Sequence, residues 1–143
     1  MHVSQILKEK GRAVETIERN VSLLDVARRL SDKRIGAVVV VDEAKRIVGI
    51  ISERDLIRVI GADGPEALNR SLADVMTTNV ITCREQDTID KIMALMTERR
   101  IRHLPVVEDG KLAGIVSIGD VVKYRVAEVE LEAMAMRDYI TAA

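Results

Sequence analysis

The chain has few aromatic residues and little net charge, and both shortages narrow the functions open to it. Its 143 residues include no Trp, no Phe and two Tyr, with a net charge of -1 and a pI near 6.2. Proteins that bind single-stranded nucleic acid stack its bases on aromatic side chains and follow its backbone with a basic groove. A membrane with anionic lipids also attracts basic surfaces. We therefore expect neither nucleic acid nor a membrane as a partner.

Cysteine and histidine are scarce, and no long hydrophobic run is present. Cys83 is the one Cys, and the two His are His2 and His103. This excludes an internal disulfide framework and a multi-Cys zinc site, and it fits a reducing compartment. The longest apolar run, residues 35–41, is too short to span a bilayer, and the first ten residues lack the apolar core of a signal peptide. We expect a soluble, cytoplasmic protein without a bound metal.

One stretch of the sequence occurs twice. Residues 101–122, IRHLPVVEDGKLAGIVSIGDVV, follow the pattern of two β-strands around a Gly-containing turn, with Asp120 at the start of a helix. At an offset of 65 or 66 residues, the matched pairs are Ile35 with Ile101, Val40 with Val106, Val41 with Val107, Gly49 with Gly114, Ile50 with Ile115, Ser52 with Ser117, and Asp55 with Asp120. Duplication in register favours a role for these residues beyond their local structure.

Each copy is preceded by the patterns of a helix, a strand and a second helix. We predict short helices over residues 3–10 and 72–76, strands over residues 13–17 and 79–83, and helices capped by Ser22 and Thr88. Apolar residues follow each cap at helical spacing. Pro105 departs from the repeat, because its counterpart is Val39.

These elements predict a mixed α/β (α+β) fold of two β-α-β-β-α repeats. A repeat of about 50 residues has too little core to be stable alone, so we expect two copies packed with pseudo-twofold symmetry. The predicted division is residues 1–62 for the first repeat with its N-terminal helix, 63–71 for a linker, 72–125 for the second repeat and 126–143 for a C-terminal helical extension. Apolar residues recur every three or four positions in that extension, which leaves open whether it packs on its own domain or on a second subunit.

A Ser followed three residues later by an Asp, between a strand and a helix, provides groups that suit a nucleotide. Ser52 with Asp55, and Ser117 with Asp120, combine a hydroxyl, a carboxylate and the unpaired N–H groups of a helix N-terminus. A carboxylate suits the two hydroxyls of a ribose, while the hydroxyl and N–H groups suit a phosphate. The alternative is that both Asp residues serve only as helix caps.

The paired repeat, its G-I-h-S-x-x-D strand exits and the IRHLPV segment resemble a tandem cystathionine β-synthase (CBS) domain pair, or Bateman module. The likeness covers nearly the whole chain. It implies a module that binds AMP, ADP, ATP, NAD(H) or S-adenosylmethionine, pairs into a disc-shaped homodimer and regulates an enzyme or transporter. No such protein is attached here, so we expect a stand-alone bacterial-type CBS domain protein with an unknown protein target.

The resemblance also implies two ligand sites between the repeats. In the first, Asp55 would hold the ribose, Ser52 would approach a phosphate and Arg54 would add a positive charge. Residues of the second repeat would form the wall of this site, namely Val80, Ile81, Thr82, Arg102, His103 and Leu104. The second site would combine Ser117 and Asp120 with Val14, Thr16, Ile17, Gly36, Ala37 and Val38.

The two implied sites differ in charge. The counterparts of Arg102, His103 and Arg54 in the repeat are Gly36, Ala37 and Gly119. Guanidinium groups bind phosphate oxygens strongly. We therefore predict that the first site prefers a charged phosphate and the second a less charged part of a ligand.

We predict a non-catalytic regulatory module that senses energy or redox state through an adenine nucleotide such as AMP, ATP or NADH and requires no cofactor. Two alternatives stay open. One is a ligand-free dimeric scaffold that recruits a partner through its C-terminal helix. The other is a nucleotide-processing enzyme that uses Asp55, Asp120 or His103, although no P-loop, nucleophile elbow or metal-ligand set accompanies them.

Overall fold

The chain divides into two compact units that do not follow the order of the repeats. The computed structural model describes residues 1–142. Unit 2 is formed by residues 14–81, and unit 1 combines residues 1–13 with the chain from residue 82 onward. The helix that begins the chain therefore packs with the second repeat, and the short helix that begins the second repeat packs with the first. This differs from the predicted grouping of the N-terminal helix with the first repeat.

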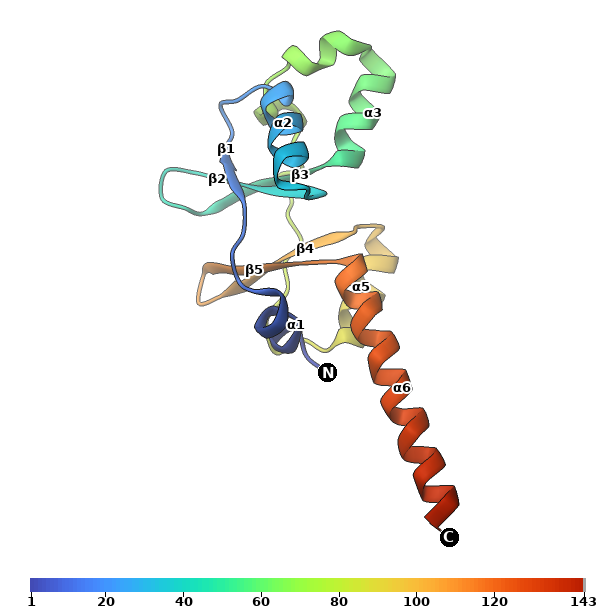
Figure 1. The fold of residues 1–143 in the computed structure, drawn as a ribbon. Helices are drawn as coiled ribbons and strands as arrows, with labels where there is room; N and C mark the ends of the chain where they lie inside the picture. Colours follow the sequence, from blue (N-terminus) through green and yellow to red (C-terminus); the bar gives the residue numbers. More distant parts are fainter. Residues whose placement is uncertain (143) are drawn as a thin grey trace. The chain divides into compact units, whose positions relative to one another are not determined.

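Unit 2 is a three-stranded sheet with helices α2 and α3 on one face (Figure 1). Its strands, in sheet order, are β1 (Thr16–Glu18), β2 (Ala37–Val41) and β3 (Ile47–Ser52). β1 runs parallel to β2, and β3 runs antiparallel to β2. The helices are α2 (Leu23–Lys33), α3 (Glu53–Asp63), the 3-10 helix η1 (Pro65–Asn69) and α4 (Leu72–Val75). The predicted β-α-β-β-α order is confirmed for this repeat.

A helix cap and helical spacing explain α2 and the core beneath it. The backbone N–H of Asp25 donates to Ser22 Oγ at 3.2 Å, as predicted for an N-cap. The main apolar members of the core, from α2 and the sheet, are Leu23, Val26, Leu30, Val38, Val40 and Ile51. The segment predicted as a linker, residues 63–71, includes η1, and Ala67 is buried in the same core. The connection between the repeats is therefore a packed part of unit 2.

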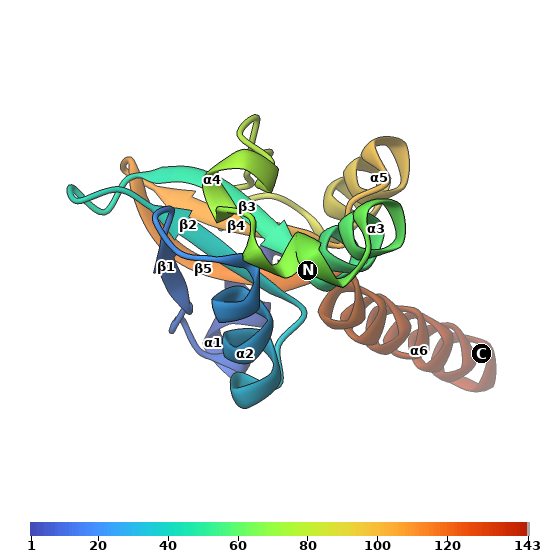
Figure 2. The same ribbon diagram turned by 90° about the horizontal axis from the view of Figure 1, so that it is seen from above.

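Unit 1 contains an antiparallel hairpin and three helices in its described part. Its elements are α1 (Val3–Lys10), α5 (Ile89–Arg99), β4 (His103–Glu108), β5 (Lys111–Ser117) and α6 (Ile118–Ala142). α6 follows the hairpin and extends well beyond the rest of the unit, as Figure 2 also shows. No helix within residues 1–142 has both the length and the apolar character needed to cross a membrane.

The strand predicted over residues 79–83 is wrong, because only an isolated bridge at Cys83 is formed. The Cys83 N–H donates to the Pro105 carbonyl at 3.0 Å. In the first repeat, the Val39 N–H donates to the Glu15 carbonyl at 3.4 Å, which continues the pairing of β1. Pro105 stands where the first repeat has Val39, and proline has no N–H to donate. The ladder of the second repeat therefore stops after one bridge.

A repeated Gly in each hairpin allows a helix to approach the sheet closely. A Cβ atom on Gly114 would lie 2.6 Å from Cδ2 of Leu7, a buried residue of α1. A Cβ atom on Gly49 would lie 2.6 Å from Sδ of Met76, at the end of α4, and 3.1 Å from the Thr77 carbonyl oxygen. The matched glycines therefore mark the places where the leading helices, which are the short helices α1 and α4 that begin the two repeats, pack on the hairpins.

We predict that Gly114→Ala lowers the free energy of unfolding by about 1–3 kcal/mol, because the added methyl group overpacks the core against Leu7. Gly61→Ala is the matched control. Gly61 lies inside α3 with nothing within 4 Å of an added Cβ, so this change should stabilise the protein by about 1 kcal/mol. Urea unfolding followed by circular dichroism measures both. Equal stability of the two variants would contradict the close approach.

Candidate ligand-binding site

Each predicted Ser–Asp pair lies where a strand ends and a helix begins. In unit 2, the backbone N–H and the hydroxyl of Ser52 donate to Oδ2 of Asp55 at 2.8 and 3.1 Å. In unit 1, the Ser117 N–H donates to Oδ2 of Asp120 at 2.9 Å, and the Asp120 N–H donates to Ser117 Oγ at 3.2 Å. The capping role considered for both Asp residues is therefore real.

Capping leaves each carboxylate with acceptor capacity, because an ionised carboxylate has about four lone-pair sites. Asp55 and Asp120 are also partly exposed, so a ligand can reach them. A cap alone does not identify a ligand site, however. Asp25 forms the same reciprocal cap with Ser22 at the start of α2, yet its counterpart in the second repeat is Lys91. The two strand-to-helix junctions, Ser52 with Asp55 and Ser117 with Asp120, differ from this cap because the same pair of residues occurs in both repeats.

The strand beside each junction contributes further predicted residues. Ala37 in unit 2 and His103 in unit 1 are the strand partners of the junction Ser residues. The residues before them, Gly36 and Arg102, accept hydrogen bonds from the first N–H groups of α3 and α6 at 2.9 and 2.8 Å. Each unit therefore brings together residues that the resemblance assigns to different sites. The resemblance also implies that residues of the other repeat complete the ligand site at each junction, and this stays a prediction.

The other predicted residues differ in what they can offer a ligand. Ile17 of β1 and Val38 of β2 are buried in the core of unit 2, and Leu104 of β4 is fully buried. Their backbone groups, rather than their side chains, are what a ligand could contact. Arg54 and Arg102 have exposed side chains. The remaining residues are Thr16, which lies on β1, and Val14, Val80, Ile81 and Thr82, which lie outside the helices and strands.

Lys10, at the end of α1, contacts the second junction, which the sequence did not reveal. Its Nζ atom donates to Oδ2 of Asp120 at 2.6 Å and to the Ile115 carbonyl at 3.1 Å. Asp55 instead pairs at 3.0 Å with Arg58 of its own helix, whose side chain is 66% exposed. Lys10 therefore adds a cationic group at the second junction, where the comparison of the repeats predicts none. No local pattern links Lys10 with Asp120, because 110 residues separate them.

The surroundings of Asp120 keep it ionised. Burial by itself would raise the pKa of the Asp120 carboxyl, but hydrogen bonds from Lys10 and from the Ser117 N–H lower it, and the resulting pKa lies below its ordinary value of 3.8. At neutral pH the carboxylate is therefore a hydrogen-bond acceptor and not a proton donor.

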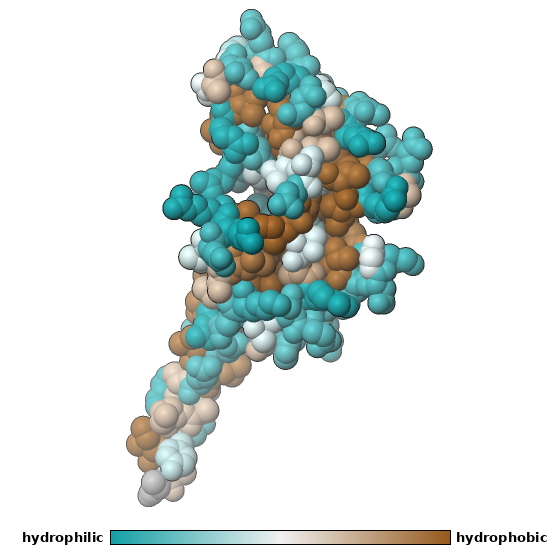
Figure 3. Space-filling view, turned by 180° about the vertical axis from the view of Figure 1, so that it is seen from behind, coloured by the Kyte–Doolittle hydropathy of each residue, from teal (hydrophilic) through white to brown (hydrophobic). Residues whose placement is uncertain are grey.

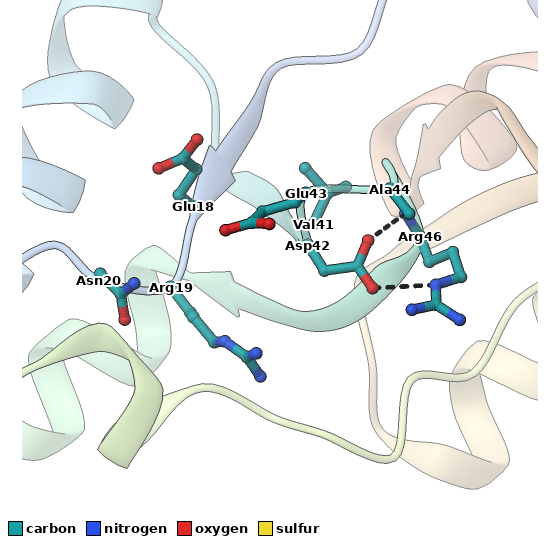
Figure 4. Close-up of a pocket in the computed structure, with 8 residues that line it drawn as sticks. All are labelled: Glu18, Arg19, Asn20, Val41, Asp42, Glu43, Ala44 and Arg46. Atoms are coloured by element: carbon teal, nitrogen blue, oxygen red, sulfur yellow. Dashed lines mark hydrogen bonds and ion pairs between the residues drawn. The ribbon is translucent and has the colours of Figure 1, made fainter.

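A surface hollow lies at the other end of the unit 2 sheet (Figure 4). It has a volume of about 460 Å³ and is lined by Glu18, Arg19, Asn20, Val41, Asp42, Glu43, Ala44 and Arg46. Asp42 accepts from the backbone N–H and from Nε of Arg46 at 2.9 and 3.0 Å, which closes the turn between β2 and β3. None of the predicted site residues lines this hollow. Residues 1–142 also contain no group of three His, Cys, Asp or Glu that could hold a metal.

Comparison with known proteins agrees with this arrangement. A family model described as CBS domain matches residues 3–62 and again residues 72–127. The CBS domain-containing protein CBSX3, mitochondrial, of Arabidopsis thaliana is 34% identical over 146 residues, which cover 96% of this chain and 71% of that protein. The crystal structure of the CBS-domain containing protein ATU1752 from Agrobacterium tumefaciens has a TM-score of 0.85 and 45% identity, covering 87% of this chain and 92% of that one.

A second solved structure adds information on ligands. The CBS domain pair of protein MJ0100 was crystallised in complex with 5′-methylthioadenosine and S-adenosyl-L-methionine. It matches with a TM-score of 0.79 and 27% identity, covering 90% of this chain and 98% of that chain. Both of its ligands carry an adenosine group.

We predict that Lys10→Met destabilises the protein in a pH-dependent way. Because the pKa of Asp120 is depressed in the folded state, the ion pair stabilises the fold above pH 3.8, and this contribution is lost as the pH falls through the folded-state pKa. Near pH 6 we expect a loss of up to about 1 kcal/mol, since both side chains are partly exposed. Urea unfolding at several pH values measures it.

The control for this prediction is Lys8→Met, because Lys8 is an exposed residue of the same helix without an ion pair among the described residues. It should leave the pH dependence unchanged. A loss in Lys10→Met that stays constant into the acid range would mean that the ion pair with Asp120 is not its cause.

Proposed function

Because the chain belongs to the CBS domain family, with two CBS domains in tandem, we propose that it senses an adenosine-containing small molecule at its two Ser–Asp junctions. CBS domain pairs are regulatory modules, and the MJ0100 pair has two such molecules bound. The observation that carries the proposal is a duplicated carboxylate, Asp55 and Asp120, held at a helix N-terminus by the Ser three residues before it.

The groups at each junction suit different parts of such a ligand. A ribose presents two neighbouring hydroxyls, and a carboxylate can accept a hydrogen bond from each of them. The N-termini of α3 and α6 favour an anionic group. Lys10 at one junction and Arg54 at the other would add attraction for a phosphate or a carboxylate. The ligands that we propose to test first are AMP, ADP, ATP and NAD(H), followed by S-adenosylmethionine.

We propose binding without catalysis. Both carboxylates are engaged as acceptors by N–H or hydroxyl groups, and the depressed pKa of Asp120 makes it a poor general acid at neutral pH. The same pair of residues, repeated, fits recognition of a ligand.

The setting in which the module works is part of the proposal. We propose a cytoplasmic homodimer that requires no cofactor and passes the state of its ligand to a protein target. A sensor of adenine nucleotides in this form would report energy charge or redox state to that target.

Asp55→Asn and Asp120→Asn test the proposal. We expect at least one adenine compound to raise the unfolding midpoint of the wild-type protein, because ligand at 100 times its dissociation constant adds about 2.7 kcal/mol of stability. At least one of the two variants should lose this response. Thermal unfolding against AMP, ADP, ATP, NAD, NADH and S-adenosylmethionine measures it.

Asp25→Asn is the matched control, because it disrupts the same kind of reciprocal cap at a place without a counterpart in the second repeat. It should keep the response to ligand. A protein that responds to none of the compounds would overturn the proposal and favour the ligand-free scaffold.

Arg102→Ala tests the predicted preference of the first site for phosphate. A hydrogen bond between charged groups contributes about 1.5 kcal/mol or more, so AMP should bind about tenfold more weakly to the variant. Arg99→Ala removes a nearby exposed Arg at the end of α5 and should leave AMP affinity unchanged. Isothermal titration calorimetry compares the two. Equal affinities would remove Arg102 from the site.

A further inference from the structure

α6 carries a row of apolar side chains that the described chain leaves exposed. The helix extends away from the rest of unit 1 (Figure 1), and hydrophobic patches lie among hydrophilic ones on its surface (Figure 3). The row consists of Val122, Val126, Val129, Ala133, Met136 and Ile140. Its large side chains are between 46% and 64% exposed. A row of this kind along a helix is normally buried against another element.

The spacing of the row is that of a coiled-coil seam. Successive members are separated by four, three, four, three and four residues, which is the 3.5-residue period of a left-handed coiled coil. The contacts of α6 with its own unit lie on a different side of the helix. There Val121 is buried and Glu128 binds the N-terminal amino group at 3.0 Å. Arg125 lies at the edge between that side and the seam, where it pairs with Asp90 at 3.5 Å.

Charges beside the seam distinguish between two orientations of a second α6. In a parallel, in-register pair, Arg125 faces Glu130 of the second copy, and Glu132 faces Arg137 of the second copy. In the antiparallel arrangement that aligns the same seam, Lys123 faces Arg137 of the second copy. Glu130 then faces Glu130 of the second copy, and Glu132 faces its Glu132. Parallel pairing thus joins opposite charges, whereas antiparallel pairing joins like charges.

We infer that α6 pairs with α6 of a second copy of this chain, in parallel and in register, through the row that begins at Val122. β-branched residues at positions such as Val126 and Ile140 are favoured in parallel two-stranded coiled coils. A lipid surface fits the same row less well, because Glu130 and Glu132 beside it would be repelled by anionic lipids. The inference rests on α6 alone and does not depend on the proposed ligand.

Engineered cysteines test the pairing and its direction. Val122→Cys and Ile140→Cys are oxidised separately and as a mixture. A parallel pair crosslinks each variant with itself, whereas an antiparallel pair crosslinks only the mixture. Native Cys83 does not interfere, because it is buried and burial raises the pKa of its thiol to about 12. Leu131→Cys, on the opposite side of the helix and 58% exposed, is the control.

Each outcome of this experiment decides between the arrangements. We expect both seam variants to form disulfide-linked dimers faster than Leu131→Cys. Crosslinking of the mixture alone would overturn the parallel orientation. Seam variants that crosslink no faster than the control would overturn the pairing itself, whatever other surface holds two copies together.

Added charges test the energetic role of the seam. Val129→Lys with Met136→Lys should raise the dissociation constant of the dimer at least about tenfold, the equivalent of about 1.4 kcal/mol, because both side chains would be buried in the pair. Leu131→Lys with Met134→Lys adds the same charge at exposed apolar positions outside the seam and is the matched control. Sedimentation equilibrium measures both, and far-UV circular dichroism checks the fold.

Equal effects of the two double variants would overturn the inference, because the change would then follow net charge and not the seam. Charge reversal gives a second check of orientation. Glu132→Arg and Arg137→Glu should each weaken the dimer, and the combination should restore it. Binding of the wild-type protein to anionic vesicles, lost in the uncharged variant Val129→Ser with Met136→Ser, would assign the row to lipid and also overturn the inference.

Discussion

The hydrogen bonds between a Ser and the Asp three residues after it decide where each hairpin ends and the next helix begins. Ser52 and Ser117 terminate β3 and β5, and the carboxylates of Asp55 and Asp120 then lie at the first turn of α3 and α6. The same side chains satisfy backbone donors and present an acceptor at a helix N-terminus. Local folding and the proposed ligand binding therefore depend on one pair of residues in each repeat.

The two repeats share this junction but differ around it. Lys10 reaches Asp120 from the N-terminal helix, whereas Asp55 has Arg58 from its own helix. Pro105 ends the second ladder after one bridge, while β1 gives the first repeat a third strand. The second of these differences arises from a single residue at a matched position, Pro105 in place of Val39. The two differences make the two proposed sites unequal, so a protein with duplicated sites could read two ligands or bind one ligand with different strength at each.

α6 connects the two proposals. Its first turn contains Asp120, and its exposed row begins two residues later at Val122. A ligand that contacts Asp120 would therefore act on the first turn of the helix that carries the seam. A helix is a stiff element, so a small change of its direction at one end moves the other end further. A module built in this way can couple occupancy of a site to association of two copies without a separate signalling domain.

The sequence by itself determined what depends on neighbours along the chain. Caps at Ser22 and Thr88, the hairpins and the long C-terminal helix were predicted because spacing, turn residues and capping residues act within a few positions. The tertiary structure alone decided which leading helix packs on which hairpin and placed Lys10 against Asp120. Those contacts join residues far apart in sequence, and two repeats with the same order of elements offer each helix two similar partners. Packing of side chains such as Leu7 against Gly114 determines which hairpin each helix contacts. Residues that are neighbours along the chain do not encode this choice.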